Sequence, residues 1–204
     1  MTQIKGTRRE DQFRYSTPGT RHPARRAVFL DRDGVINRPV VVDSKPYPPR
    51  SSAEFDLLPG VPEACSRLRA AGFLLVVVTN QPDVGRGTLD RATVELIHAE
   101  MCRRLPIDLV KVCYHAGEKY GEPCGCRKPR PGMLLEAARE LEIDLASSFM
   151  VGDRWRDVDC GKRAGCQTIF IDWNYDEPLR EAPDLRADSL LDAARLLTMP
   201  TSAR

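Results

Sequence analysis

The chain of 204 residues lacks any long apolar run. A helix that crosses a bilayer needs about 20 predominantly apolar residues in succession, and no uncharged stretch of this kind approaches that length. Residues 1–26 also lack the apolar segment of a secretory signal peptide, so we expect the protein to stay in the cytoplasm without a membrane partner. Internal repeats are absent too, which leaves one ordinary domain and a tail as the expected organisation.

An excess of charge of either sign is also lacking over most of the chain. The 31 Lys and Arg residues and 29 Asp and Glu residues give a net charge of +2. Residues 1–26 hold seven basic and two acidic residues, a net charge of +5, which leaves −3 for the remainder. This composition, without apolar periodicity, predicts a flexible basic extension at 1–24 and a domain at 25–204. Because the domain is slightly acidic, no nucleic-acid partner is expected.

Short apolar runs alternate with amphipathic stretches along the domain. The apolar runs, which are typical of strands buried on both faces, lie at 27–31, 73–79, 109–114, 149–153 and 168–172. The amphipathic stretches, which predict helices, lie at 61–71, 91–105, 131–141, 156–164 and 189–197. This alternation predicts an α/β fold with a doubly wound parallel sheet, in which ligands bind at the carboxyl ends of the strands.

Polar residues stand at those carboxyl ends. Asp31 and Asp33 close the first predicted strand, and Asp153 closes the fourth. Crowded carboxylates need a compensating cation, and Mg²⁺ accepts carboxylate, water and phosphate oxygens. Thr79, after the second strand, offers a hydrogen bond to a phosphoryl oxygen, and Lys128, before the third helix, offers a positive charge. Together these residues predict phosphoryl transfer.

The seven cysteines form an odd number in a chain without an export signal, which favours reduced thiols and metal ligation over disulfides. Cys113 and His115 are followed at short distance by Cys124 and Cys126. Three thiolates and one imidazole suit a tetrahedral structural Zn²⁺ site, and a reduced surface cluster is the alternative. The cysteines outside this cluster, which we expect to be packing residues, are Cys65, Cys102, Cys160 and Cys166.

The polar residues, in their order, resemble the four motifs of the haloacid dehalogenase (HAD) superfamily of phosphatases. The resemblance rests on Asp31-Arg32-Asp33-Gly34, Thr79-Asn80, Lys128 and Gly152-Asp153. It implies a HAD-like, Rossmannoid fold and a covalent route, in which Asp31 attacks phosphorus while Asp33 protonates the leaving alkoxide and then activates water. It also implies that Asp31, the backbone carbonyl of Asp33 and Asp153 hold Mg²⁺.

Two further acidic residues lie in the predicted helix that follows Asp153. Asp157 stays open between a metal ligand, a support for the ligands and a helix cap. Asp159 is expected to be a solvated helix residue.

The Cys and His pairs running into the sequence CRKPRPGM, together with DRDGVIN and VVVTNQ, narrow the resemblance. They resemble the D-glycero-D-manno-heptose 1,7-bisphosphate 7-phosphatases and the related histidinol-phosphate phosphatases, which are capless. The residues implied to be catalytic are Asp31, Asp33, Thr79, Arg127 and Lys128. The residues implied to contact substrate are Asp31, Arg32, Asp33, Thr79, Asn80, Gln81, Arg127, Lys128 and Arg154. Arg127 suits a second phosphate because its guanidinium binds oxygens bidentately.

The favoured function is therefore Mg²⁺-dependent removal of the 7-phosphate from the heptose bisphosphate, by a monomer acting on a small phosphorylated sugar. The enzymatic alternatives are a histidinol-phosphate or other small-molecule phosphatase, and a polynucleotide-end phosphatase, which would need a basic groove. A non-enzymatic alternative is a zinc-stapled scaffold that binds phosphorylated ligands. Tyr47 and Trp155 are left open as site residues.

Overall fold

The computed structural model describes residues 25–42, 45–117, 119–121 and 124–199, so the predicted extension at 1–24 lies outside the described residues. A six-stranded sheet with the order β5-β4-β1-β6-β7-β8 forms its centre, and all neighbouring strands are parallel. The strands are β1 (Ala27–Leu30), β4 (Leu74–Asn80), β5 (Leu109–Cys113), β6 (Phe149–Gly152), β7 (Gln167–Ile171) and β8 (Leu185–Ala187). The predicted parallel α/β fold is confirmed.

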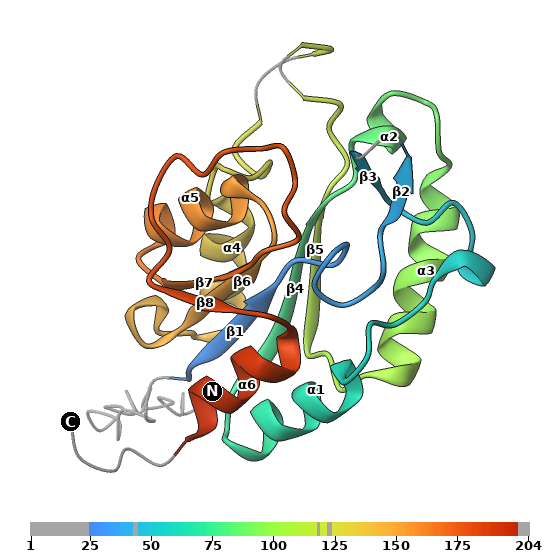
Figure 1. Cartoon of the computed structure of the whole chain (residues 1–204). Coiled ribbons are helices and arrows are strands. Elements are labelled where there is room, and N and C mark those ends of the chain that lie inside the picture. The colour runs from blue at the N-terminus through green and yellow to red at the C-terminus, as the bar shows by residue number, and fades with distance from the viewer. Residues whose placement is uncertain (1–24, 43–44, 118, 122–123, 200–204) are drawn as a thin grey trace, which may run out of the picture.

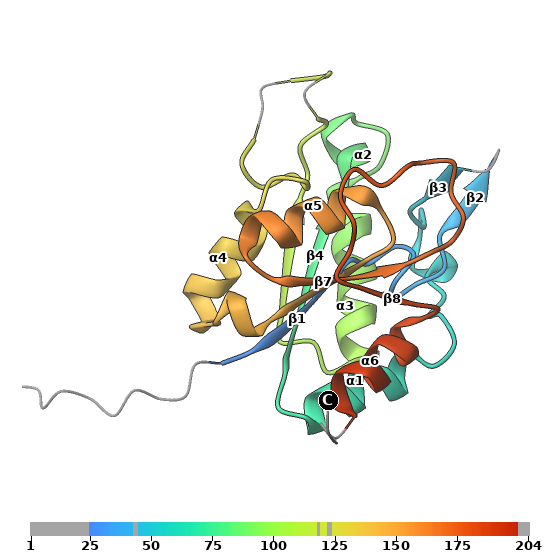
Figure 2. The same ribbon diagram turned by 60° about the vertical axis from the view of Figure 1, so that its left-hand side comes forward.

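Helices cover both faces of this sheet (Figures 1 and 2). The helices of one face are α1 (Val61–Ala70), α3 (Arg91–Arg104) and α6 (Leu190–Thr198), and those of the other are α4 (Gly132–Leu141) and α5 (Trp155–Ala164). Successive strand residues point to opposite faces, so Val28 and Leu30 enter the core beneath α1, α3 and α6. Ala27 and Phe29 enter the core beneath α4 and α5.

Several short elements were not predicted. The small strand β8 extends the sheet beyond β7, and β2 (Val40–Val42) pairs antiparallel with β3 (Lys45–Tyr47). Strands of three residues carry too few positions for alternation to be visible, and the proline in β3 argues against a strand by removing a donor. The remaining short elements are η1 (Ser52–Glu54), α2 (Pro82–Gly85) and η2 (Leu145–Ser147).

The hairpin β2–β3 stands apart from the main sheet (Figure 1), and the described residues contain no separate cap domain. Among the helices of the described residues, none is long and apolar enough to cross a membrane.

Two expectations about single residues were wrong. Asp159 was expected to be solvated, yet α5 turns it inward and leaves it 2% exposed, with Arg163 Nη2 at 3.4 Å from its Oδ2. Cys102 was expected to pack in the core, yet its position on α3 faces solvent. The other cysteines outside the cluster, Cys65, Cys160 and Cys166, are buried as predicted.

Candidate active site

Asp31 and Asp153 follow two neighbouring strands, β1 and β6, at the same edge of the sheet. The Asp31 N–H donates to the Val151 carbonyl at 3.0 Å, which continues the pairing of the strands up to the carboxylate. Gly34 has φ +89°, and a Cβ atom there would lie 2.0 Å from Asp153 Oδ2. A glycine is therefore required after the two aspartates, both for the turn and for the space that the third carboxylate occupies.

Three carboxylates converge at this edge. Asp31, Asp153 and Asp157 each offer one oxygen, and these oxygens lie within 4.8 Å of one another. Burial raises the pKa of Asp31 to about 6, and the charges of Asp157 and Asp33 act in the same direction, against that of Lys128. Burial, followed by the charges of Asp31 and Asp157, raises the pKa of Asp153 well above its usual value.

Oδ1 of Asp153 is buried and has no hydrogen-bond partner within the described part of the chain. A buried, unpaired carboxylate oxygen that faces other carboxylates costs free energy unless a cation or a proton meets it. The group of three carboxylates therefore has the donor set and the crowding that suit a hard divalent cation.

Lys128 supplies the positive charge of the site. It is 2% exposed, and its Nζ lies 2.9 Å from Asp31 Oδ1 and 2.6 Å from Asp157 Oδ1. The side-chain amide of Asn80 brackets the backbone of Lys128, donating to its carbonyl at 3.1 Å and accepting from its N–H at 3.1 Å. Asn80, for which a substrate contact was predicted, thus holds the lysine in place.

For Asp157 the sequence left open the roles of helix cap, support for the metal ligands and metal ligand. The structure shows contacts of the first two kinds, and the position of Asp157 among the three carboxylates is compatible with the third. Its Oδ2 accepts from the Arg154 N–H at 3.0 Å and so caps the first turn of α5. Its other oxygen pairs with Lys128 and so supports the cation beside Asp31. A Cβ atom on Gly152 would lie 2.1 Å from Asp157 Cβ, so the glycine before Asp153 makes room for this residue.

Asp33 points to a different set of partners. Its Oδ2 accepts from Arg32 Nη2 at 2.8 Å and from Gln81 Nε2 at 2.9 Å, and its Oδ1 accepts from Asn37 Nδ2 at 3.0 Å. Burial acts to raise the pKa of Asp33, but the Arg32 charge and these hydrogen bonds outweigh burial and lower the pKa below its usual value. The side chain is therefore held in its ionised form.

The side chains of Arg32 and Gln81, for which a substrate contact was predicted, are turned toward Asp33. They are 0% and 1% exposed, and both are occupied by Asp33. Beneath them lies His98 of α3, a residue that the sequence analysis missed, with Nε2 at 3.0 Å from Arg32 Nη1. Burial, and then the Arg32 charge, lower the pKa of His98 to about 4, so the ring is neutral and accepts the hydrogen bond.

A pocket of about 200 Å³ opens over these groups. The predicted site residues that line it are Asp31, Asp33, Thr79, Asn80, Arg127, Asp153 and Arg154. The lining residues that were not predicted are Tyr47, Pro48, Pro82 and Arg156. Tyr47, which the sequence left open, thus brings the hairpin to the pocket wall, while Arg154 also pairs with Glu177.

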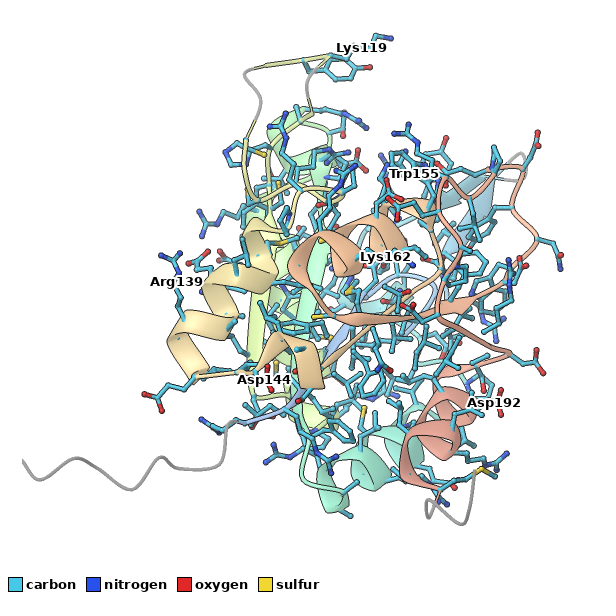
Figure 3. All side chains as sticks on the ribbon, turned by 90° about the vertical axis from the view of Figure 1, so that its left-hand side faces the viewer. Lys119, Arg139, Asp144, Trp155, Lys162 and Asp192 are labelled. Carbon is cyan, nitrogen blue, oxygen red and sulfur yellow. The ribbon has the colours of Figure 1, made fainter. Side chains whose placement is uncertain are left out.

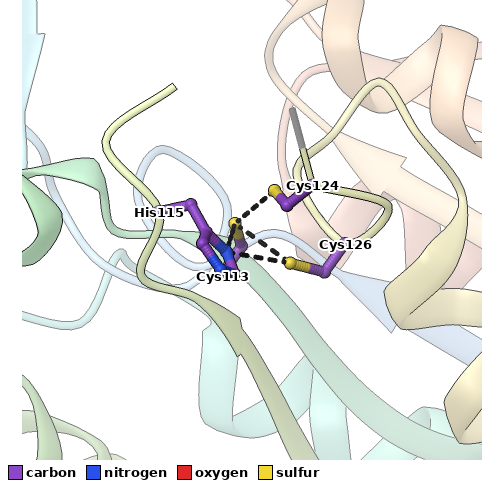
Figure 4. Close-up of side chains that lie close together, drawn as sticks. All are labelled: Cys113, His115, Cys124 and Cys126. Atoms are coloured by element: carbon purple, nitrogen blue, oxygen red, sulfur yellow. Dashed lines mark hydrogen bonds between the residues drawn. The ribbon is translucent and has the colours of Figure 1, made fainter. Parts of the chain in front are cut away.

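The second cluster is formed by the last residue of β5 and by the loop that follows it (Figure 4). Cys113 Sγ lies 3.4 Å from Cys126 Sγ and 3.7 Å from Cys124 Sγ, and His115 Nδ1 lies 3.2 Å from Cys126 Sγ. A Zn–S bond of about 2.3 Å places two sulfurs of a tetrahedron about 3.8 Å apart. The four residues therefore have the donor types and nearly the spacing of a closed zinc site.

Burial raises the pKa of the Cys113 thiol, so a thiolate at this position needs a nearby cation. The loop then continues through Cys126 directly into Arg127 and Lys128. Arg127 Nη1 donates to the His115 carbonyl at 3.4 Å, and Arg130 Nη1 donates to the Cys124 carbonyl at 2.8 Å. The cluster is thus bonded to the segment that carries Lys128, the residue that pairs with Asp31 and Asp157.

Comparison with known proteins agrees with this geometry. Residues 125–193 match the family model described as HAD-hydrolase-like. The chain is 39% identical over 178 residues to the D-glycero-β-D-manno-heptose-1,7-bisphosphate 7-phosphatase of Pasteurella multocida, covering 83% of this chain and 92% of that protein. It is 38% identical over 149 residues to the enzyme of the same name from Bordetella bronchiseptica, covering 71% of this chain and 79% of the relative.

Among solved structures, the chain resembles the D,D-heptose 1,7-bisphosphate phosphatase of Bordetella bronchiseptica, which was solved as a complex with magnesium and phosphate. The TM-score is 0.69 at 33% sequence identity, and the match covers 84% of this chain and 97% of the other.

Proposed function

The chain belongs to the HAD-type phosphatases that include the D-glycero-β-D-manno-heptose-1,7-bisphosphate 7-phosphatases, and from this membership we propose that it removes the 7-phosphate of that heptose bisphosphate. The observation that carries the proposal is the placement of Asp31 beside Lys128 and within the group of three carboxylates. A nucleophile, a fixed positive charge and a cation site at one strand edge are the parts that phosphoryl transfer requires.

In the proposed reaction a carboxylate oxygen of Asp31 forms a bond to phosphorus while the bond from phosphorus to the sugar oxygen breaks. Lys128, 2.9 Å from Asp31 Oδ1, counters the negative charge of the phosphoryl oxygens, and Thr79 and Arg127 line the same pocket. Water then attacks the aspartyl phosphate, which releases inorganic phosphate and restores the Asp31 carboxylate.

Asp33 has the proton-transfer role in this scheme. It gives a proton to the leaving sugar oxygen in the first step and takes one from water in the second. The contacts from Arg32, Asn37 and Gln81 favour its ionised form, which is the form that the second step needs. For the first step the carboxyl has to be protonated, so we expect it to leave part of this network when substrate enters.

Mg²⁺ fits the site at which the carboxylates of Asp31, Asp153 and Asp157 converge. Asp31 and Asp153, with the backbone carbonyl of Asp33, would hold the ion, and the unpaired Oδ1 of Asp153 supports this assignment. Bound there, Mg²⁺ would neutralise phosphate oxygens and lower the repulsion between the phosphate and the Asp31 carboxylate. Asp157 is within the same group and would support the ligands through Lys128 and the cap of α5.

Zn²⁺ fits the cluster of Cys113, His115, Cys124 and Cys126, because four soft or borderline donors converge with no additional donor among the described residues. Its proposed role is structural: it would fix the loop that presents Arg127 and Lys128. The proposal further assigns the protein to the cytoplasm, as a monomer that acts on a small phosphorylated sugar.

The test of the proposal is Asp31→Asn, assayed by Mg²⁺-dependent phosphate release from the heptose bisphosphate and from histidinol phosphate. We expect the wild type to prefer the bisphosphate and the variant to lose at least about a thousandfold in kcat, because an amide cannot form the covalent intermediate. The matched control is Asp56→Asn, an acidic side chain that is 70% exposed and should leave kcat unchanged.

Activity of Asp31→Asn within a few-fold of wild type would contradict the covalent route. Turnover of histidinol phosphate alone would contradict the substrate. Unfolding temperatures of both variants, measured alongside, establish that each remains folded.

A further inference from the structure

A second cavity, of about 650 Å³, adjoins the pocket over the carboxylates and shares Arg127 and Arg156 with it. We call it the arginine cavity, after the five arginines and one tryptophan that the argument uses, namely Arg86, Arg127, Arg156, Arg163, Arg180 and Trp155. Of its 14 lining residues, 8 are Lys or Arg, and none of these described residues is Asp or Glu. The cavity therefore concentrates positive charge in a domain whose net charge is slightly negative.

Carboxylates outside the cavity compensate only part of this charge. Arg86 pairs with Asp83 at 3.3 Å, and Arg163 pairs with Asp159 at 3.4 Å. Glu177 is shared between Arg156, at 3.0 Å, and the neighbouring Arg154. Arg86, Arg156 and Arg163 thus have carboxylate partners, and Arg130, which also lines the cavity, donates to the Cys124 carbonyl at 2.8 Å.

Arg127 and Arg180 have no carboxylate partner among the residues that the structure describes. Two uncompensated arginines at one cavity indicate a ligand that carries negative charge.

Arg180 is held in place by an aromatic ring instead. Its guanidinium carbon lies 3.4 Å from the centroid of Trp155, which also carries the Arg156 guanidinium at 4.9 Å. The indole N–H donates to Glu177 Oε1 at 2.9 Å, which fixes the ring. Stacking uses the face of a guanidinium and leaves its N–H groups in the plane free to bind oxygens.

The elements around the cavity are far apart in the sequence. Trp155 begins α5, near the edge from which the loop carrying Lys119 projects (Figure 3), and Arg180 lies in the loop between β7 and β8. Arg127 follows the cysteine cluster and lines both cavities. A ligand with one phosphate over Asp31 can thus extend past Arg127 toward Arg180.

Arg127 is already expected to meet the second, remote phosphoryl group of the proposed substrate, and we propose that Arg180, stacked on Trp155, is a further residue that holds this group. The inference rests on the proposed phosphatase function and deepens it, because it makes Arg180 a residue that selects a sugar bisphosphate over a monophosphate. A guanidinium pair binds phosphate oxygens in a bidentate manner and repels a cationic substrate end such as a protonated amine.

The experiment compares Arg180→Met with wild type on the heptose 1,7-bisphosphate and on the heptose 7-phosphate. We expect the ratio of kcat/KM for the bisphosphate to that for the monophosphate to fall by about tenfold or more, since one charge-assisted contact is lost. Arg180→Lys, which keeps the charge without the planar fork, should lie between the two.

The matched control is Arg186→Met. Arg186 stacks over Phe170 at 5.3 Å and pairs with Asp172, but it does not line the arginine cavity. In Arg186→Met the ratio of kcat/KM for the bisphosphate to kcat/KM for the monophosphate should stay at the wild-type value. An unchanged ratio in Arg180→Met, or an equal loss for both substrates, would overturn the inference.

A binding measurement separates this inference from the proposed function. The measurement uses calorimetry on protein that carries Asp31→Asn. Adding Arg180→Met should raise the Kd for the heptose bisphosphate about tenfold or more, and should raise the Kd for the monophosphate less. A bisphosphate Kd that does not change, or no binding at all, would overturn the inference even if wild-type protein hydrolyses phosphomonoesters. Conversely, binding that depends on Arg180 without turnover by the wild type would support the inference and contradict the proposed function. Unfolding temperatures show whether each variant is folded.

Discussion

His98 is the residue whose role is least visible in the sequence. It is 7% exposed, and its neutral ring accepts from Arg32, whose guanidinium in turn holds the Asp33 carboxylate. Arg32 is fully buried, so an N–H group without an acceptor there would cost about 1–3 kcal/mol. His98 is therefore expected to be a positioning residue for the proton transfers of Asp33.

His98→Leu should lower kcat by about 10- to 100-fold with little change in KM, because Arg32 loses its acceptor and no longer fixes Asp33. His98→Gln keeps an oxygen acceptor and should retain most of the activity. Steady-state kinetics with the heptose bisphosphate, together with unfolding temperatures, would measure this. Equal activity of the two variants would show that the hydrogen bond has no part in catalysis.

At the scale of elements, the loop between β5 and α4 joins the two clusters. It begins at Cys113, passes the other zinc-ligand candidates and ends with Arg127 and Lys128. Of its described residues, few belong to regular structure, so the loop has little backbone pairing of its own to hold the lysine. A bound metal would supply the missing constraint.

Cys126→Ser should reduce the zinc content from near one per chain to a small fraction and lower kcat/KM by about tenfold or more, since supports of this kind typically contribute 10- to 100-fold. Cys102→Ser, which changes an exposed thiol outside the cluster, should keep both values. Elemental analysis and kinetics on the purified proteins measure the two effects. Wild-type protein that is folded and active without zinc would contradict the assignment of a zinc site.

For the whole molecule, the buried histidine makes the free energy of unfolding depend on pH. The pKa of His98 is about 4 in the folded protein, against 6.5 as its ordinary value. Between these values the unfolded chain binds a proton that the folded chain does not, so stability rises with pH in this window and is lost as the pH falls. The raised pKa of Asp31 acts in the opposite direction.

Lowering the pH from 7 to 5 should therefore cost wild type about 2 kcal/mol more of unfolding free energy than it costs His98→Gln. The contribution of Asp31 is present in both proteins and cancels in the difference. Urea unfolding of both proteins at the two pH values, with Mg²⁺ kept constant, gives the four free energies of unfolding that this comparison needs. Parallel losses in the two proteins would mean that His98 is protonated in the fold.

Much of the fold of this molecule follows from local sequence pattern. The apolar runs predicted five of the six strands of the main sheet, because strands buried on both faces are continuous in apolar residues. The amphipathic stretches predicted α1, α3, α4, α5 and α6 to within one or two residues. Strand β8 and the hairpin β2–β3 have three residues per strand, and only pairing with a neighbour reveals them.

The position of the site also followed from the chain alone, since parallel strands bring their carboxyl ends to one edge and so bring Asp31 and Asp153 together. The packing of the helices on the sheet, in contrast, decides which side chains at that edge face the pocket. Arg32 turns inward to a histidine 66 residues away, and Arg180 reaches Trp155 across one helix and one strand. No local pattern encodes these contacts, because burial and charge pairing between distant segments arise only once the helices have packed on the sheet.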